Sequence, residues 1–372
     1  MKQPKGQIKF ISQDKNEFFT KVKSRVDSYF KDNKISIYYN RKMVVKSIVL
    51  ISTYVLPFIA ICVLQPAAWI SLILWAIMGI GMAGVGMSVM HDANHGAYTK
   101  SKLVNNILGF TVNLCGGSSH NWKLQHNILH HTYTNVTGLD DDIDDKLGMR
   151  FSPHTKLHGF QKLQFIYAFL FYGIITLYWS TLKDFIQFIR YTKNGVNPNT
   201  KSENTFFFFE IIFNKLAYFF VLLFVPIYYL NIPVWEIVTG FIIMHVLAGI
   251  ILSVIFQMAH TVEGTTHPMP DANGSIQNNW AIHQMNTTVD FARDSKWISW
   301  YIGGLNFQVE HHLFPKICHI HYPEIAKIVK QTAQECGIPY LENETFGQAL
   351  RSHIITLKRL GNLPPLNEVL AG

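Results

Sequence analysis

The sequence predicts an all-α integral membrane protein whose transmembrane helices form two hairpins. Hydrophobic residues make up 49% of the 372 residues and charged residues only 15%, whereas soluble proteins average about 25% charged residues. Four long apolar stretches occur in two closely spaced pairs, and the short connections within each pair contain no Lys or Arg. These observations exclude an ordinary soluble domain.

Each of the four apolar stretches is long enough to cross a bilayer, which takes about 20 mostly apolar residues. The predicted spans are Met43–Leu64, Ala68–Met90, Phe206–Leu230 and Val234–Phe256. The third span carries Glu210 and Lys215 near its start, and we expect both side chains to snorkel toward the interface. In the second span, Gly79, Gly81, Gly84 and Gly86 predict close helix packing, with room for an acyl chain as the alternative.

The distribution of basic residues predicts the topology. Gln65–Ala67 and Asn231–Pro233, which join the spans within each hairpin, carry no Lys or Arg, whereas the two ends and the segment 91–205 hold nearly all the basic residues. The positive-inside rule therefore places both termini and both long segments in the cytoplasm. We divide the chain into a basic N-terminal arm (1–42), a membrane domain (43–335) and a cytoplasmic tail (336–372). The arm is polar and basic and has no apolar core, so we expect no cleavable signal peptide.

Two further segments have helical character without the length of a span. Residues 10–30 have the apolar spacing of an amphipathic helix that lies on the membrane surface or on the protein. Ile166–Trp179 is too short to span comfortably, so we predict an interfacial helix over 160–190, with a fifth span as the alternative. The four cysteines form no CxxC pair, and no basic, aromatic-interleaved module suggests nucleic-acid binding.

Histidines gather where predicted spans leave the membrane. His91 and His95 stand in HDANH, and their i, i+4 spacing puts both rings on one helix face. HNILHH repeats this spacing at His126 and His130, while His131 is expected to turn about 100° away from them.

A third cluster, QVEHH, contains Gln308, His311 and His312, and His260 lies just beyond the last span. The predicted topology puts all these groups on the cytoplasmic side. Eight histidines are too many for one four-coordinate zinc, so two metal ions are expected. The fold class is therefore four transmembrane helices in two hairpins, with a cytoplasmic helical cap that holds a di-metal site.

Several polar residues are candidates to support this site. Asp92 and Glu310 lie inside the clusters, where a carboxylate can orient a metal-bound histidine through its other ring nitrogen. An acidic run follows the second cluster and can be a solvated loop or serve the same role; it comprises Asp140, Asp141, Asp142, Asp144 and Asp145. Asn127 is a candidate lining residue. His245, in the middle of a span, is either functional or a hydrogen-bonded neutral side chain.

The three clusters resemble the three histidine boxes of the membrane fatty acid desaturases. Box order, box spacing and the two hairpins agree over residues 40–335. Gln308, at the position of a leading histidine, resembles the front-end branch, which desaturates between an existing double bond and the carboxyl end. SSHNWKLQHNILHHTYTN and GGLNFQVEHHLFP are similar to that branch as well.

The resemblance implies a set of metal ligands. It comprises His91, His95, His126, His130, His131, His260, Gln308, His311 and His312. Some relatives have an Asn four residues before the equivalent of His260 that holds a metal through water. Phe256 occupies that position here, and Gln257 is the candidate substitute.

The resemblance also implies the chemistry. We expect two iron ions, O2 as co-substrate and a long-chain fatty-acyl substrate that gains a cis double bond. The sequence has no His-Pro-Gly-Gly haem motif, so no bound haem is expected, and a separate donor of the ferredoxin or cytochrome b5 type supplies electrons. This pattern resembles bacterial members, which implies the bacterial inner membrane.

Two rival functions remain open on the sequence. A di-iron membrane lipid hydroxylase has similar boxes and differs in the fate of the substrate radical. A metal transporter could use histidine-rich loops, but its ion path needs paired polar residues in the spans, which offer little beyond His245. A zinc protease of the HExxH type is excluded because that motif is absent.

Overall fold

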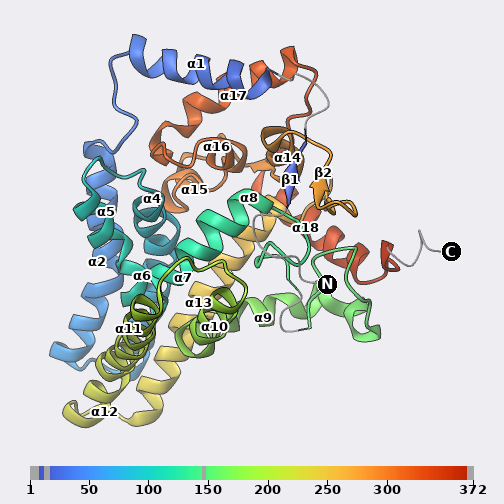
Figure 1. The fold of residues 1–372 in the computed structure, drawn as a ribbon. Coiled ribbons are helices and arrows are strands. Elements are labelled where there is room, and N and C mark those ends of the chain that lie inside the picture. Colours follow the sequence, from blue (N-terminus) through green and yellow to red (C-terminus); the bar gives the residue numbers. More distant parts are fainter. Residues whose placement is uncertain (1–7, 12–16, 145–147, 367–372) are drawn as a thin grey trace. The chain divides into compact units, whose positions relative to one another are not determined.

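The computed structural model describes residues 8–11, 17–144 and 148–366, which are mostly helical (Figure 1). The chain forms two compact units, each assembled from segments that are separated in sequence. Unit 1 comprises Met1–Tyr38, Gln125–Ala168 and Ile255–Gly372. Unit 2 comprises Tyr39–Leu124 and Phe169–Val254. The predicted all-α class is confirmed apart from four strands of two residues each.

Among the described residues, five helices are long and apolar enough to cross a membrane: Arg41–Leu64, Ala68–His95, Gly159–Lys193, Lys201–Tyr229 and Val234–His260. Four of them match the predicted spans, although Lys201–Tyr229 starts earlier than predicted and both Ala68–His95 and Val234–His260 end later. The remaining one, Gly159–Lys193, includes the segment assigned to the interface. Its helix runs for 35 residues, well beyond the apolar stretch Ile166–Trp179. Together with the four expected helices, it makes the chain a membrane protein.

Unit 2 contains the two helical hairpins. Its elements are α2 (Arg41–Leu64), α3 (Ala68–Gly84), η1 (Val85–Val89), α4 (Met90–His95), α5 (Lys102–Gly109), α6 (Thr111–Leu114), α7 (Ser119–Trp122), η4 (Trp179–Lys183), α10 (Asp184–Lys193), α11 (Lys201–Phe219), η5 (Phe220–Phe224), α12 (Val225–Tyr229) and most of α9 (Gln164–Tyr178) and α13 (Val234–His260). A Cβ at Gly81 would lie 2.5 Å from the Tyr54 nitrogen, and one at Gly79 would lie 2.6 Å from the Met244 oxygen. Close packing at these two glycines is thereby confirmed.

Two buried polar side chains within the helices of unit 2, Lys215 and His245, have hydrogen-bond partners in the same unit. The Lys215 ammonium is buried and donates to Asp184 at 2.8 Å and to the carbonyls of Gly116 and Trp179. The expectation that Lys215 snorkels to the interface is therefore wrong, because an internal carboxylate pairs with it. His245 contacts the Tyr218 hydroxyl at 2.9 Å and the Thr176 hydroxyl at 3.0 Å. This geometry supports the hydrogen-bonded alternative for His245.

Unit 1 contains the N-terminal arm, the middle segment and the C-terminal part of the chain. Its elements are β1 (Lys9–Phe10), α1 (Phe18–Asp32), most of η2 (Lys123–His130), α8 (His131–Tyr133), η3 (Gly159–Leu163), β2 (Ser275–Ile276), α14 (Trp280–Thr287), β3 (Asp290–Phe291), α15 (Lys296–Tyr301), α16 (Gln308–Leu313), η6 (His319–His321), α17 (Tyr322–Glu335), β4 (Glu342–Asn343) and α18 (Phe346–Leu360). The strands pair in parallel as β1 with β2 and β3 with β4.

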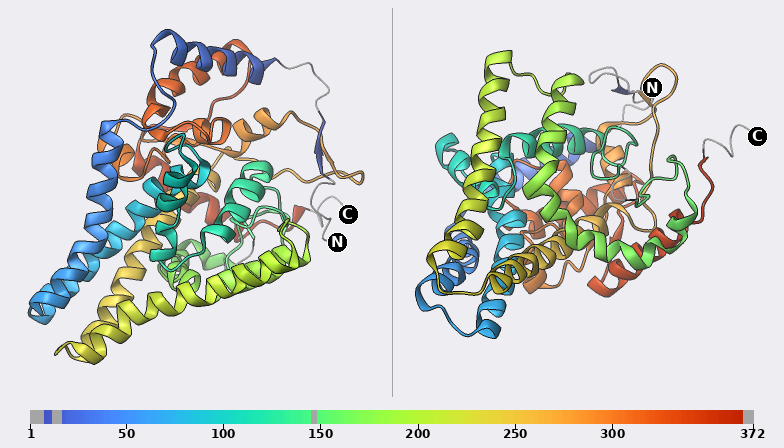
Figure 2. Two further views of the ribbon diagram at one scale, coloured as in Figure 1. Left: turned by 60° about the vertical axis from the view of Figure 1, so that its left-hand side comes forward. Right: turned by 90° about the horizontal axis from the view of Figure 1, so that it is seen from below.

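Helix α1 lies beside α17, as Figures 1 and 2 show. Its buried face carries Phe18, Val22, Val26 and Phe30, four residues apart, and joins the same hydrophobic cluster as Val329 and Ala333. Arg25 and Lys21 both pair with Glu335 at 2.7 Å. The amphipathic helix predicted in the arm therefore lies on the protein.

Candidate metal centre

Six of the predicted ligands converge inside unit 1. His126 and His130 come from η2, His131 from α8, His260 from the end of α13, and His311 and His312 from α16. All six are buried. Ligand atoms lie within 4.8 Å of one another in two groups, His130–His260–His312 and His131–His311–His312, which share His312. Segments far apart in sequence thus build one imidazole-rich site.

The helix that carries the second box is a π-helix, and this changes the expected geometry. In η2 the rings of His126 and His130 stack with centroids 5.1 Å apart, as the i, i+4 spacing predicts. His131, however, does not turn away, since its Nε2 atom lies 3.3 Å from the Nε2 atom of His126. The wider turn of a π-helix brings residue i+5 back toward residue i. All three histidines of the box therefore face the same site.

Four of the six histidines are fixed through their Nδ1 atoms. His130 Nδ1 lies 3.0 Å from Asp140 Oδ2, and His312 Nδ1 lies 2.8 Å from Gln284 Oε1. His260 Nδ1 contacts the Thr287 carbonyl at 3.2 Å, and His311 Nδ1 contacts the Tyr322 hydroxyl at 3.3 Å. Such contacts set the ring orientation and leave Nε2 as the coordinating atom, as in known metal sites.

Several Nε2 atoms of the site lie close to one another or have no hydrogen-bond partner, and a bound cation would satisfy them. His131 Nε2 lies 3.0 Å from His311 Nε2 in addition to its contact with His126. One N–H can donate to only one of these neighbours. Among the described residues, the Nε2 atoms of His130 and His260 and both polar atoms of the Gln308 amide are buried without a hydrogen-bond partner. Buried polar atoms rarely stay unpaired, so the donor set fits transition-metal ions that bind imidazole.

Asp140 supplies the negative charge beside the site. Burial opposes its ionisation, but His130 and the backbone N–H groups of Asp142 and Asn135 more than offset this, so the pKa of Asp140 falls to about 2. Burial also opposes the charged form of His130 and by itself would lower its pKa. The Asp140 carboxylate outweighs this effect, so the pKa of His130 is raised. An ionised Asp140 favours the tautomer of His130 with the proton on Nδ1.

The residues predicted to support the ligands lie in different surroundings. Glu310 turns toward Tyr340, whose hydroxyl donates to it at 3.0 Å and to Asp290 at 2.6 Å. Gln257 accepts from the Thr261 hydroxyl at 2.6 Å, and Asn127 is half-buried on η2. The ring of Phe256, by contrast, lies 5.1 Å from that of His130 and 5.0 Å from that of His260. An aromatic wall therefore stands where some relatives have an Asn.

The first box belongs to unit 2. His91 and His95 lie on α4, which ends at Gly96 with a positive φ of 73°. Their ring centroids are 4.7 Å apart, and each lies 5.6 Å from the ring of Trp122. Asp92 Oδ1 is 3.9 Å from His91 Nδ1. The i, i+4 spacing thus places the two imidazoles side by side within this unit, as predicted.

The C-terminal tail holds the segment that carries His260. Arg150 is fully buried and donates to the Leu363 carbonyl at 2.6 Å and to the Leu360 carbonyl at the end of α18. His353, on α18, contacts the Thr261 carbonyl at 2.8 Å. Burial lowers the pKa of His353 to about 4, so the ring is neutral at pH 7. The tail therefore supports the residue next to a predicted ligand.

Sequence reasoning missed three of the four Nδ1 partners. Gln284, Thr287 and Tyr322 lie on α14 or at the start of α17 and have no distinguishing spacing. Asp140 was one of five acidic candidates, and its position ten residues after His130 was the available signal. Asp145 lies outside the described residues.

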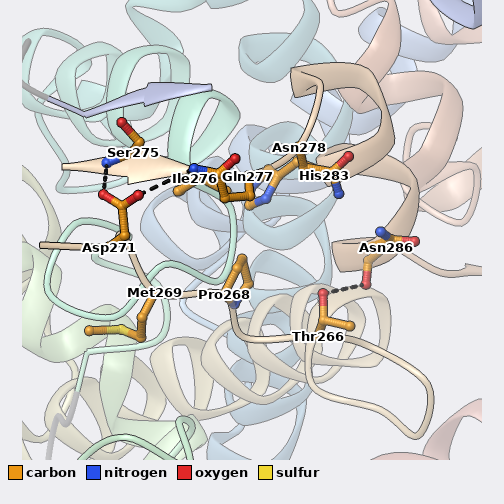
Figure 3. Close-up of a pocket in the computed structure, with 10 residues that line it drawn as sticks. All are labelled: Thr266, Pro268, Met269, Asp271, Ser275, Ile276, Gln277, Asn278, His283 and Asn286. Atoms are coloured by element: carbon orange, nitrogen blue, oxygen red, sulfur yellow. Dashed lines mark hydrogen bonds between the residues drawn. The ribbon is translucent and has the colours of Figure 1, made fainter. Parts of the chain in front are cut away.

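A separate pocket is lined in part by residues of α14 (Figure 3). It has a volume of about 340 Å³ and is lined by Thr266, Pro268, Met269, Asp271, Ser275, Ile276, Gln277, Asn278, His283 and Asn286. His283 lines this pocket, whereas the next residue, Gln284, contacts His312. Neighbouring residues of α14 thus contribute to the pocket and to the histidine site.

Comparisons with known proteins identify the family. The model of the family "Fatty acid desaturase" matches residues 67–343. An acyl-lipid (8-3)-desaturase from Physcomitrium patens is 34% identical over 96% of this chain and 74% of its own length. An sn-1 linoleoyl-lipid 6-desaturase from Arthrospira platensis is 34% identical over 93% of both chains. One of the same name from Synechocystis sp. is 32% identical over 95% of this chain and 98% of its own. The chain therefore belongs to the fatty acid desaturase family and is an oxidoreductase.

Proposed function

We propose that the protein inserts a cis double bond into a long-chain acyl group in an O2-dependent reaction, with two iron ions at the histidine site. One observation carries this proposal. Six histidines from four elements direct ring nitrogens at one another inside unit 1, and four are held from behind through Nδ1. Such an arrangement suits metal binding far better than structural packing.

The resemblance and the geometry together suggest which residues hold the ions. The set is His126, His130, His131, His260, His311 and His312, with His91 and His95 added by the resemblance and Gln308 as a ninth ligand. When bound, iron supplies the O2 activation that an unactivated methylene requires. The chain's own residues orient the ligands, and Phe256 excludes water beside His130 and His260.

The substrate class follows from the relatives. Two of those named above are linoleoyl-lipid 6-desaturases and a third is an acyl-lipid (8-3)-desaturase. We propose front-end desaturation of an acyl lipid or acyl-CoA, in agreement with Gln308 in the third box. A methylene offers no polar group to bind, so the position of the new double bond depends on how the chain is held.

The membrane arrangement remains part of the proposal. We propose four spans in two hairpins and a cytoplasmic cap with the di-metal site, with Gly159–Lys193 at the interface. The division at 42/43 and 335/336, the cytoplasmic termini and the bacterial inner membrane belong to the same proposal. A separate ferredoxin or cytochrome b5 type protein supplies electrons, since each double bond requires two from outside.

The test is expression in a bacterial host fed defined fatty acids, followed by gas chromatography of the extracted lipids. The account predicts a new cis-unsaturated product that depends on O2 and is absent from the His130→Ala variant. A hydroxylated lipid without new unsaturation would show that the hydroxylase alternative is right. Metal uptake by intact cells without any lipid product would favour a transporter.

A further inference from the structure

Helix α14 connects the histidine site to the surface of unit 1. Trp280, its first residue, is half-buried, and its indole Nε1 donates to the backbone carbonyl of His131 at 3.1 Å. One turn later, Gln284 donates to the same carbonyl at 3.2 Å and contacts His312 at 2.8 Å. An aromatic ring that reaches solvent is therefore one hydrogen bond away from a predicted ligand.

Trp280 belongs to a small aromatic cluster that is partly exposed. Phe19 of α1 is also half-buried, and its ring meets that of Trp280 edge to face at 5.6 Å. Phe19 stacks at 6.1 Å on Phe314, which is buried in the hydrophobic cluster and directly follows the helix that carries His311 and His312. We call Phe19, Trp280 and Phe314 the aromatic patch. Rigid aromatic groups of this kind are common at the centres of protein interfaces.

Two exposed lysines lie close in sequence to residues of the aromatic patch. Lys23, one helical turn after Phe19, pairs with Asp27 at 2.5 Å, and Lys316 is exposed two residues after Phe314. The arm 1–42, which contains Phe19, has eleven Lys and Arg against four Asp and Glu. It thus carries seven of the eight net positive charges of the chain. A partner with a negative face would be attracted to the arm.

We propose that a small acidic one-electron carrier protein docks on the aromatic patch and passes its electrons through the Trp280 indole and the His131 carbonyl to the metal centre. This inference rests on the proposed function, which needs two electrons for each double bond. Each transfer oxidises the reduced cofactor of the carrier by one electron and reduces one ferric ion to ferrous. With two electrons, two protons and two hydrogens from the acyl chain, O2 becomes two water molecules.

The geometry explains why this route suits electron transfer. Electron tunnelling is faster through covalent bonds and hydrogen bonds than across a van der Waals gap. The path from the indole ring to the His131 imidazole crosses a single hydrogen bond and otherwise follows bonded atoms. An anionic lipid headgroup would also be attracted to the arm, but it would give no role to the Trp280 contact.

The experiment uses the full-length, iron-loaded protein in nanodiscs of zwitterionic phosphatidylcholine, which removes anionic lipid. Reduced [2Fe–2S] ferredoxin is mixed with it anaerobically, and ferredoxin oxidation is followed by stopped-flow absorbance. We expect Trp280→Ala to slow this oxidation by about tenfold or more. Trp280→Phe keeps the ring and loses the donor, so it should give an intermediate rate. Trp297→Ala, which removes an 83% exposed aromatic from the same unit, is the matched control and should behave as wild type.

Two further measurements separate electron entry from a structural role. Dithionite should reduce the iron of Trp280→Ala as fast as that of wild type, at equal iron content. Lys316→Glu should weaken ferredoxin binding to the zinc-loaded protein, and added salt should weaken wild-type binding in the same way.

Some results would overturn the inference. A wild-type rate of ferredoxin oxidation by Trp280→Ala would do so, and so would an equal loss of rate with dithionite or of bound iron. If the wild-type protein bound no iron at all, the proposed function would fail instead, while ferredoxin binding to the zinc-loaded protein would still decide the docking site.

Discussion

His245 and Lys215 of unit 2 and His130 and His260 of unit 1 are all buried ionisable side chains, but their hydrogen bonding differs. In unit 2, His245 is bonded at both ring nitrogens, and Lys215 has a carboxylate and two carbonyls as acceptors. In unit 1, His130 and His260 are bonded at Nδ1, while their buried Nε2 atoms have no hydrogen-bond partner among the described residues. The comparison teaches that a buried polar side chain whose donors and acceptors are all hydrogen-bonded has a structural role. A buried ring nitrogen without a partner suggests a metal ligand.

The largest effect is expected when a predicted metal ligand of unit 1 is removed. We predict that His130→Ala or His312→Ala abolishes fatty-acid unsaturation while the protein stays in the membrane, because each removes a shared or fixed ligand. Gas chromatography of host lipids, with immunoblotting of the membrane fraction, measures both. Normal product from either variant would show that the two-metal assignment is wrong.

The next effect concerns the carboxylate behind His130. Asp140→Asn keeps the shape of the side chain and removes its charge, so iron affinity should fall by about 10–100-fold. Competition with a chelator, followed by metal analysis, measures the change. Asp144→Asn, in the same acidic run, is the matched control. If Asp140→Asn retained iron as well as wild type, the Asp140 carboxylate would have no part in metal binding.

A smaller but still severe effect is expected at Gln308, whose buried amide has no hydrogen-bond partner among the described residues. We predict that Gln308→Ala lowers product formation by about tenfold or more, in line with the loss of a group placed for the reaction. Product yield per unit of membrane protein measures this, with exposed Gln331→Ala as the control. A fully active Gln308→Ala variant would show that the amide is dispensable.

The smallest effect on catalysis is expected in unit 2. His245→Phe removes the ring contacts to the Tyr218 and Thr176 hydroxyls, but Thr176 still donates to the backbone carbonyl of residue 245. The expected cost is therefore that of one unsatisfied group, the Tyr218 hydroxyl, at about 1–3 kcal/mol. Thermal unfolding in detergent should therefore shift downward, while activity per folded, iron-loaded molecule stays close to wild type. Loss of activity at full iron content and unchanged stability would break the comparison between the two units.

The sequence predicts the parts of this protein that depend on local composition. Apolar length locates four of the five long helices, and the i, i+4 spacing puts His91 beside His95 and His126 beside His130. It does not predict that His131 turns inward, because a π-helix over Lys123–His130 cannot be told from an α-helix by spacing.

The remaining features depend on contacts between distant segments. Gln284 reaches His312, and Asp184 reaches Lys215, across 28 and 31 positions of the chain. No periodicity connects such pairs, since their proximity follows from tertiary packing. The same reason hides the role of the tail, where His353 contacts the carbonyl of Thr261, 92 positions earlier.

Iron analysis combined with X-ray absorption at the iron edge, on the purified wild-type protein, tests the central claim most directly. The account predicts about two iron ions per chain with a first shell dominated by imidazole nitrogen. A first shell dominated by oxygen or sulfur, or a protein that binds no more than one ion, would contradict it.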